Sequence, residues 1–140
     1  MLLYLIKRVE QAARARLDDI VRPLGLTALQ YAALTVLERQ DGMTSAQLAR
    51  NSFVTAQSMA DMIAILEGSG LIERHRDQSD RRRRLVALSP RGRALLDRCR
   101  PEIADLESSM LGDLSPGEVD ALRHTLRVCH GNLTNTPLVL

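Results

Sequence analysis

The chain has 140 residues, of which 45% are hydrophobic and 26% charged, a composition that fits one folded globular domain and excludes a disordered chain. It has no run of about 18 apolar residues, so we expect no membrane span, and its N-terminus does not have the pattern of a signal peptide. Two cysteines cannot form a disulfide framework, which together with these features predicts a cytoplasmic protein.

The positive charge is concentrated in one segment, although the net charge of the chain is only +2. Eight arginines between Arg74 and Arg93 oppose only Asp77 and Asp80, which gives +6 within twenty residues and leaves −4 for the other 120. A basic segment on a mildly acidic body predicts a surface that binds a polyanion such as nucleic acid.

The first half of the chain has the periodicity of helices. Apolar residues at steps of three and four over residues 1–24 predict one amphipathic helix that ends near Pro23 and Gly25. Thr27 with Gln30 has the spacing of a capping box and predicts a second helix over residues 29–38.

Two short helices follow. Thr44 with Gln47 is another capping box, and the helix that it opens runs to about Asn51. Thr55 starts a fourth helix that ends at Gly68 or Gly70. Because only residues 51–54 join these two helices, their spacing is typical of a helix-turn-helix.

Residues 71–89 change to the period of strands. Two extended segments, 71–76 and 84–89, flank the polar stretch 77–83, which predicts a β-hairpin placed as a wing after the helix-turn-helix. The four consecutive arginines 81–84 are expected to alternate across a strand, so that about half face a DNA duplex. In the alternative interpretation they form only a solvated run of charge.

The last third of the chain predicts two more helices. Ser89-Pro90 opens one whose apolar stripe includes Leu95, Cys99, Ile103, Leu106 and Met110, and Pro101 is expected to bend it. Ser115 with Glu118 opens the final helix, which carries the stripe Val119, Leu122, Leu126, Cys129 and Leu133. The expected fold class is mainly α with a small β-hairpin wing, formed by one domain over residues 1–140.

The second helix of a helix-turn-helix enters the major groove with its N-terminal residues at the base edges. Gln57 can make paired hydrogen bonds to adenine there, and Thr55 and Ser58 can reach phosphates or bases. The alternative is that Thr55 only caps the helix while the other two are solvated. Asp61 either accepts from a cytosine amine or points away, and the sequence leaves both open. The predicted DNA-binding residues are Thr44, Ser45, Thr55, Gln57, Ser58, Arg74, Arg76, Arg81, Arg82, Arg83 and Arg84.

Six residues from the hairpin to the following helix fit one spaced pattern, namely Asp80, Arg82, Val86, Leu88, Ser89 and Gly92. In this pattern, and in the phrases LTALQY at 26–31 and LEGSGL at 66–71, the chain resembles the multiple antibiotic resistance regulator (MarR) family. The resemblance covers nearly the whole chain and implies a winged helix-turn-helix regulator of transcription.

The resemblance implies a repressor that binds a near-palindromic operator in double-stranded DNA as a homodimer. Residues 1–24 and 90–140 would form the dimerisation helices and residues 27–89 the DNA-binding winged lobe. Arg82 would enter the minor groove, and Asp80 would hold the wing by pairing with a neighbouring arginine. The apolar stripes of the first and last two helices also favour a dimer, although all three could pack within one chain.

The resemblance further implies release from DNA by a small effector, often aromatic or anionic, in a crevice near Arg14 and Tyr31. Tyr31 could equally be plain core packing, and the sequence identifies no ligand. Two alternatives of another class are a redox regulator acting through Cys99 or Cys129 and a winged-helix module that binds proteins. We expect no enzyme, and assign no catalytic residue, metal or cofactor.

Overall fold

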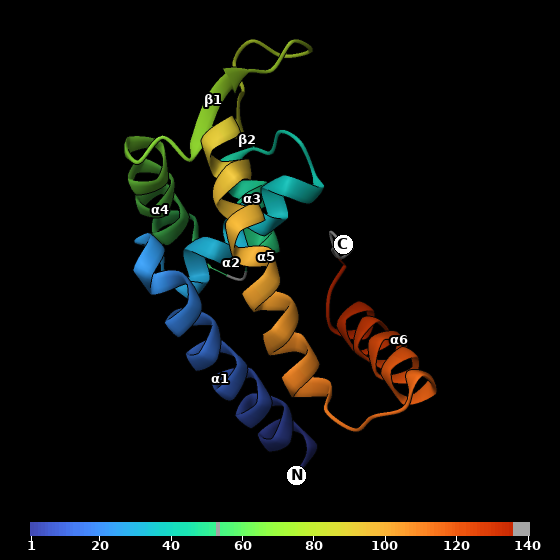
Figure 1. Ribbon diagram of the computed structural model, residues 1–140. Helices are drawn as coiled ribbons and strands as arrows, with labels where there is room; N and C mark the ends of the chain where they lie inside the picture. The colour runs from blue at the N-terminus through green and yellow to red at the C-terminus, as the bar shows by residue number, and fades with distance from the viewer. Residues whose placement is uncertain (53, 136–140) are drawn as a thin grey trace.

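The computed structural model describes residues 1–52 and 54–135, so residues 136–140 of the predicted dimerisation region lie outside the described part. The elements are α1 (Leu2–Val21), η1 (Arg22–Leu24), α2 (Ala28–Arg39), α3 (Ser45–Asn51), α4 (Ala56–Gly68), β1 (Ile72–Arg76), β2 (Arg84–Leu88), α5 (Pro90–Leu111) and α6 (Pro116–Leu133) (Figure 1). The predicted mainly helical fold with one hairpin is confirmed.

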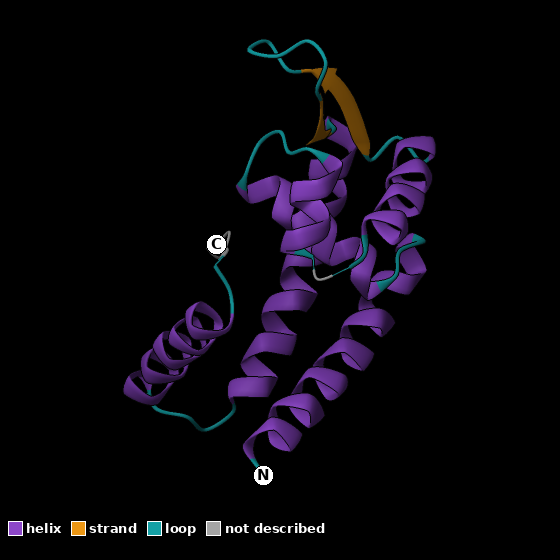
Figure 2. Cartoon of the chain, turned by 180° about the vertical axis from the view of Figure 1, so that it is seen from behind, coloured by secondary structure: helices purple, strands orange, loops and turns teal. Residues whose placement is uncertain are grey.

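The helices form two regions. The long helices α1 and α5 lie side by side, whereas α2, α3, α4 and the hairpin gather at one end of this pair (Figures 1 and 2). The hairpin loop and the N-terminus lie at opposite ends of the molecule, and α6 stands apart from the other helices in both views. No residue of α6 is buried against the rest of the described chain.

The helix starts follow from local capping, as the sequence predicts. The Thr27 hydroxyl accepts the backbone N–H of Gln30 at 3.1 Å, and the Gln30 side chain accepts the backbone N–H of Thr27 at 3.0 Å. The same reciprocal pair opens α3 and α6. A tertiary contact adds to the cap of α2, because the backbone N–H of Ala28 donates to the Asp18 carboxylate of α1 at 2.6 Å.

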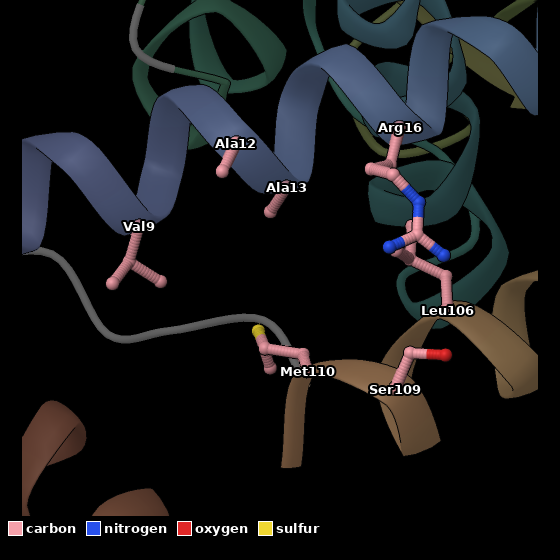
Figure 3. Close-up of a pocket in the computed structure, with 7 residues that line it drawn as sticks. All are labelled: Val9, Ala12, Ala13, Arg16, Leu106, Ser109 and Met110. Carbon is pink, nitrogen blue, oxygen red and sulfur yellow. The ribbon is translucent and has the colours of Figure 1, made fainter. Parts of the chain in front are cut away.

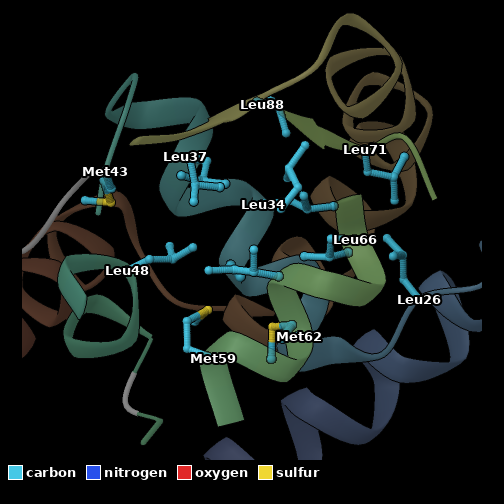
Figure 4. Packing of buried hydrophobic residues seen from close by; sticks show 14 of the residues in the cluster. Leu26, Leu34, Leu37, Met43, Leu48, Met59, Met62, Leu66, Leu71 and Leu88 are labelled. Atoms are coloured by element: carbon cyan, nitrogen blue, oxygen red, sulfur yellow. The ribbon is translucent and has the colours of Figure 1, made fainter. Parts of the chain in front are cut away.

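One apolar core joins α2, α3, α4 and the base of the hairpin (Figure 4). Its fully buried side chains include Leu34, Leu37, Met43, Leu48, Met59, Ile63 and Leu66. These residues recur at helical spacing, so burial of their shared face holds the three short helices together. The start of α5 joins the same core through Leu96 and Cys99.

The stripe predicted on α5 is partly wrong. Leu96, which the predicted stripe omits, is buried, whereas Leu95 is partly buried against the core and Met110 is exposed. The first turns of α5 pack on the hairpin and its later turns on α1, so no single stripe describes both halves. The helix continues through Pro101, and the bend expected there stays a prediction.

Within the described residues no single helix is long and apolar enough to cross a membrane. Only the bent pair Leu2–Leu24 and Ala28–Arg39, whose two parts meet at 84°, has the length and composition of a span.

The hairpin is fixed at its base by a third segment of chain. β1 and β2 pair antiparallel with Ile72 opposite Leu88 and Arg76 opposite Arg84. Met43, just before α3, exchanges backbone hydrogen bonds with Val86 of β2, at 3.0 and 2.6 Å. The hairpin is therefore joined through backbone bonds to the start of α3.

Gly92 lets α5 approach the hairpin closely. A Cβ at this position would lie 2.2 Å from the backbone oxygen of Leu71 and 2.7 Å from a methyl carbon of Leu88. Both distances are below van der Waals contact, and one of the two atoms belongs to the backbone. Gly92 is therefore required by packing, which explains its place in the sequence pattern.

We expect Gly92→Ala to lower the free energy of unfolding by about 2 kcal/mol or more, because overpacking displaces backbone. Gly68→Ala is the matched control, since no atom lies within 4 Å of its Cβ position and its conformation is helical. That variant should be neutral or stabilising by up to about 1 kcal/mol. Urea denaturation followed by circular dichroism measures both, and equal stabilities would contradict the packing argument.

Candidate nucleic-acid interface

Two aspartates build the loop at the tip of the hairpin. The Asp77 carboxylate accepts the backbone N–H of Ser79 at 2.9 Å and its hydroxyl at 2.7 Å. The Asp80 carboxylate accepts the backbone N–H of Arg82 at 3.0 Å. The hydrogen bonds from Ser79 are the main reason why the pKa of Asp77 is lowered from its ordinary value. The loop therefore holds its shape through hydrogen bonds to two carboxylates.

This loop corrects two sequence predictions. Arg81, Arg82 and Arg83 lie in the turn and only Arg84 begins the strand, so the four arginines do not alternate across a strand. The reason is local, because the hydrogen bonds of Asp80 close a turn over these residues. Within residues 1–52 and 54–135, no arginine side chain pairs with Asp80. It binds backbone instead, and Asp77 forms the ion pair, to Arg83 at 3.7 Å.

The loop concentrates exposed positive charge. Arg76, Arg81, Arg82, Arg83 and Arg84 are all exposed, with only Asp77 and Asp80 among them. Arg76 faces Arg84 directly across the two strands. Like charges in this arrangement destabilise a hairpin, so a bound polyanion would relieve a repulsion that the free protein contains. Arg74 differs, because its guanidinium pairs with Glu67 of α4 at 3.3 Å.

The start of α4 presents the other predicted contacts to solvent. Thr55, Gln57 and Ser58 are exposed. The Thr55 hydroxyl accepts the backbone N–H of Ser58 at 3.1 Å, so Thr55 does cap the helix. The Gln57 amide donates to the Asp61 carboxylate one turn later at 3.3 Å. Asp61 thus orients the amide, a role that the sequence did not indicate.

The remaining predicted DNA contacts lie at the start of α3. Thr44 caps this helix and Ser45 is its first residue, and both are half-buried. The backbone bonds from Met43 to β2 place this helix start beside the hairpin.

Arg14 and Tyr31, the residues expected near an effector, line one cavity of about 640 Å³ between α1, α2 and α5. Burial is the main factor that raises the pKa of the Tyr31 phenol, and the nearby Cys99 adds to it, so the hydroxyl is neutral near pH 7. A neighbouring groove of about 250 Å³ shares Ala13, Leu106 and Met110 with this cavity. Figure 3 shows α1 and α5 facing each other across the groove.

Sequence reasoning missed Ser52, which also lines the larger cavity. This residue is 8% exposed, and its hydroxyl has no hydrogen-bond partner among residues 1–52 and 54–135. In the sequence, Ser52 is recognisable only as a polar residue in the turn between two helices. Such turns are usually solvated, so its burial follows from tertiary packing alone.

Cys99 does not have the surroundings of a redox sensor. Burial, followed by the charge of Glu102, raises the pKa of the Cys99 thiol. Of the two arginines that flank Cys99, Arg98 lowers this pKa as the smallest of the three causes, and Arg100 pairs with Glu38 and Asp97. A raised pKa reduces the reactive thiolate. Cys129 is exposed on α6, not buried on a stripe.

The chain is similar to known proteins over this whole arrangement. The family model described as MarR family matches residues 26–83, which hold the helix-turn-helix and most of the hairpin. The chain is 33% identical over 112 residues to the HTH-type transcriptional repressor Rv2887 of Mycobacterium tuberculosis, covering 80% of this chain and 81% of that protein.

Two solved structures show the same fold. A mutant of Escherichia coli MarR complexed with operator DNA has a TM-score of 0.80 at 27% identity, over 91% of this chain and 92% of that one. Bordetella bronchiseptica BpsR, whose DNA binding is regulated by 6-hydroxynicotinic acid, has a TM-score of 0.80 at 27% identity, over 92% of this chain and 98% of that one. Fold, hairpin pattern and relatives agree, and the chain belongs to the MarR family of transcriptional regulators.

Proposed function

We propose that the protein is a repressor that binds a near-palindromic operator as a homodimer and leaves it when a small molecule binds. The observation that carries this proposal is the tip of the hairpin, where three exposed arginines of the loop and one at each adjoining strand end surround two aspartates that hold the loop. Such a loop fits the narrow minor groove, where the negative potential attracts arginine. Rv2887, a relative by sequence, is named as a repressor.

The base-reading residues are proposed to be on α4. One N–H of the Gln57 amide is used by Asp61, which leaves the amide oxygen and the second N–H for a base. That pair of groups matches the N6 and N7 atoms of adenine in the major groove. Thr55 and Ser58, with Thr44 and Ser45 of α3, are proposed to contact the backbone or bases nearby. Arg74 is proposed to contact phosphate at the edge of the interface.

The dimer is proposed from apolar surface that one chain leaves uncovered. The start of α1 exposes Leu2, Leu3, Leu5, Ile6 and Val9, and α6 exposes Leu122, Leu126 and Leu133. A patch of this extent on a folded chain indicates a partner surface. Residues 1–24 and 90–140 would cover each other in two copies, and a twofold axis would set two winged lobes, each over residues 27–89, on successive turns of DNA.

The effector site is proposed to be the cavity lined by Arg14 and Tyr31. It lies between α1 and α5 on one side and α2 on the other, where the proposed dimerisation helices meet the winged lobe. A molecule bound there would change the angle between the two regions and hence the spacing of the two lobes. The DNA binding of BpsR, which shares the fold, is regulated by 6-hydroxynicotinic acid.

The test of operator binding compares the upstream region of the protein's own gene with random duplex DNA across a salt series. Selective binding that weakens steeply with salt is expected, because phosphate contacts release counterions. Arg82→Ala should reduce operator affinity at least about tenfold and lower the salt slope by about one. Arg39→Ala removes one exposed positive charge at the end of α2, outside the proposed DNA contacts and the proposed dimerisation helices, and should change neither value. Equal effects of the two variants would overturn the role of the wing.

Gln57→Ala should relax the base preference at one position per half-site by about 1–3 kcal/mol, because paired hydrogen bonds to adenine are lost. Binding selection from a randomised operator library measures the preference at every position at once. The positions that Gln57 does not touch are the internal control. An unchanged profile at every position would remove Gln57 from the interface.

Leu126→Glu should convert the dimer into a monomer and weaken operator binding, since it places a charge in the apolar face of α6. His124→Glu is the matched control, because residues two apart on a helix point in widely different directions and His124 lies on the side away from the stripe. Sedimentation velocity measures both variants. A dimer that survives Leu126→Glu would show that α6 is not its interface.

A further inference from the structure

The corner between α1 and α2 joins the two regions of the molecule (Figure 1). α1 continues into η1, and Gly25, whose φ is 81°, then turns the chain toward α2. The helical segments Leu2–Leu24 and Ala28–Arg39 meet at 84°. α1 is one of the long helices, and α2 belongs to the core of the winged lobe. The angle at this corner therefore determines how the lobe lies on the long helices.

One side chain of α1 braces the corner. The Asp18 carboxylate accepts the backbone N–H of Ala28, the first residue of α2, at 2.6 Å. Within residues 1–52 and 54–135 no other side chain of α1 forms a hydrogen bond or an ion pair with the winged lobe. The two residues are ten apart in the sequence, so the bond closes the corner into a ring.

The partners in this hydrogen bond make it a favourable one. The N–H of Ala28 lies in the first turn of a helix and has no acceptor within that helix. Ala28 is buried, and the capping pair of Thr27 and Gln30 satisfies only its own two N–H groups. A carboxylate at a helix N-terminus interacts favourably with the helix dipole. Loss of the Asp18 carboxylate would leave a buried donor unpaired, which is unfavourable.

The other contacts between α2 and the long helices specify the angle less closely. Val21 at the end of α1 is fully buried in the core, but apolar packing is not directional. Near the far end of α2, Glu38 pairs with Arg100 of α5, whose side chain is 56% exposed, and such a pair contributes little. A hydrogen bond has a preferred direction, so the bond of Asp18 restricts the angle as well as the contact.

We propose that Asp18 is a positioning residue for operator binding. Its bond to Ala28 fixes the angle between α1 and the winged lobe, and in the homodimer this angle sets the separation of the two half-sites that the protein binds. A change at the corner moves both recognition helices, because a twofold axis relates the two chains. The proposal rests on the proposed function and adds a residue that lies outside the proposed DNA contacts.

Three variants separate this bond from a general effect of charge. Asp18→Ala removes the bond, and Asp18→Asn keeps an acceptor oxygen without the charge. Asp19→Ala is the matched control, because it removes the same charge from the neighbouring position of α1. The Asp19 carboxylate is 74% exposed, and its partner in the described chain is Arg22 at 3.9 Å, one turn further along.

Operators with two identical half-sites, separated by spacers that differ by single base pairs, measure the spacing preference. A duplex with one half-site measures the affinity of the lobe itself. Asp18→Ala should lose about five- to tenfold in affinity at the preferred spacing and discriminate less against neighbouring spacings, because the competent angle becomes one of several. Its half-site affinity should stay within about twofold of the unaltered protein, since the DNA contacts remain. Asp18→Asn should lie between the two, and Asp19→Ala should match the unaltered protein.

Three outcomes would overturn the proposal. Asp18→Ala could keep the spacing preference of the unaltered protein, which would show that the bond does not set the angle. It could lose as much affinity for the single half-site as for the full operator, which would show that Asp18 supports the fold of the lobe instead. Asp19→Ala could have the same effect as Asp18→Ala, which would reduce the role to charge.

A measurement without DNA distinguishes this proposal from the proposed function. A spin label is attached through Ile65→Cys, an exposed position of α4, in a Cys129→Ser background where the remaining Cys99 is buried. Pulsed electron resonance then gives the distribution of distances between the two lobes of a dimer, which should broaden in Asp18→Ala and not in Asp19→Ala. An unaltered distribution in Asp18→Ala would overturn the role of Asp18 alone. Absence of any preferred spacing in the unaltered protein would instead contradict the proposed function.

Discussion

The junction between the hairpin and α5 fixes the position of the wing. The Ser89 hydroxyl donates to the backbone oxygen of Gly70 at 2.6 Å and accepts the backbone N–H of Gly92 at 3.0 Å. The backbone of Ser89 also donates to Leu71 at 3.1 Å. One buried serine therefore ties the end of α4, the start of the hairpin and the first turn of α5 together, and Gly92 is the residue whose small size permits it. A wing that carries several like charges needs such an anchor, since its own strands gain little from Arg76 facing Arg84.

Two acidic residues hold the loop that presents the basic surface of the wing. Asp77 and Asp80 lie among five arginines, yet their carboxylates accept hydrogen bonds from N–H and hydroxyl groups of the loop. In the part of the chain that the structure describes, only Arg83 of the five is paired, to Asp77 at 3.7 Å. At that separation and in solvent an ion pair contributes little. The loop thus takes its shape from hydrogen bonds to its two carboxylates, while most of the positive charge of the arginines stays available to bind a polyanion.

Local signals in the sequence predicted the parts of the fold that local physics decides. The capping pairs Thr27–Gln30, Thr44–Gln47 and Ser115–Glu118 each open a helix, because these residues satisfy N–H groups within one turn. Prediction failed where a side chain overrode periodicity, as Asp80 does by turning the arginine run into a loop. It was also incomplete for the cavity, where Arg14 and Tyr31 were named from the family resemblance and Ser52 was not. The walls come from α1, α2, α5 and Ser52 at the C-cap of α3, and no pattern within one segment indicates which of these residues meet.

The links between the two regions explain how the cavity could control the interface. The Asp18 carboxylate of α1 holds the first N–H of α2 at 2.6 Å, and Arg100 of α5 pairs with Glu38 near the other end of α2. The winged lobe therefore contacts the long helices at both ends of α2, and the cavity lies between α2 and these helices. Close-packed elements respond to an inserted molecule by shifting as units. The backbone bonds of Met43 and the hydrogen bonds of Ser89 join the hairpin to α3, α4 and the first turn of α5, so the winged lobe would shift as one unit. Under the proposed function, a ligand between α1, α2 and α5 would move the whole lobe relative to α1 and the later turns of α5, and would thereby change the spacing of the two lobes of a dimer.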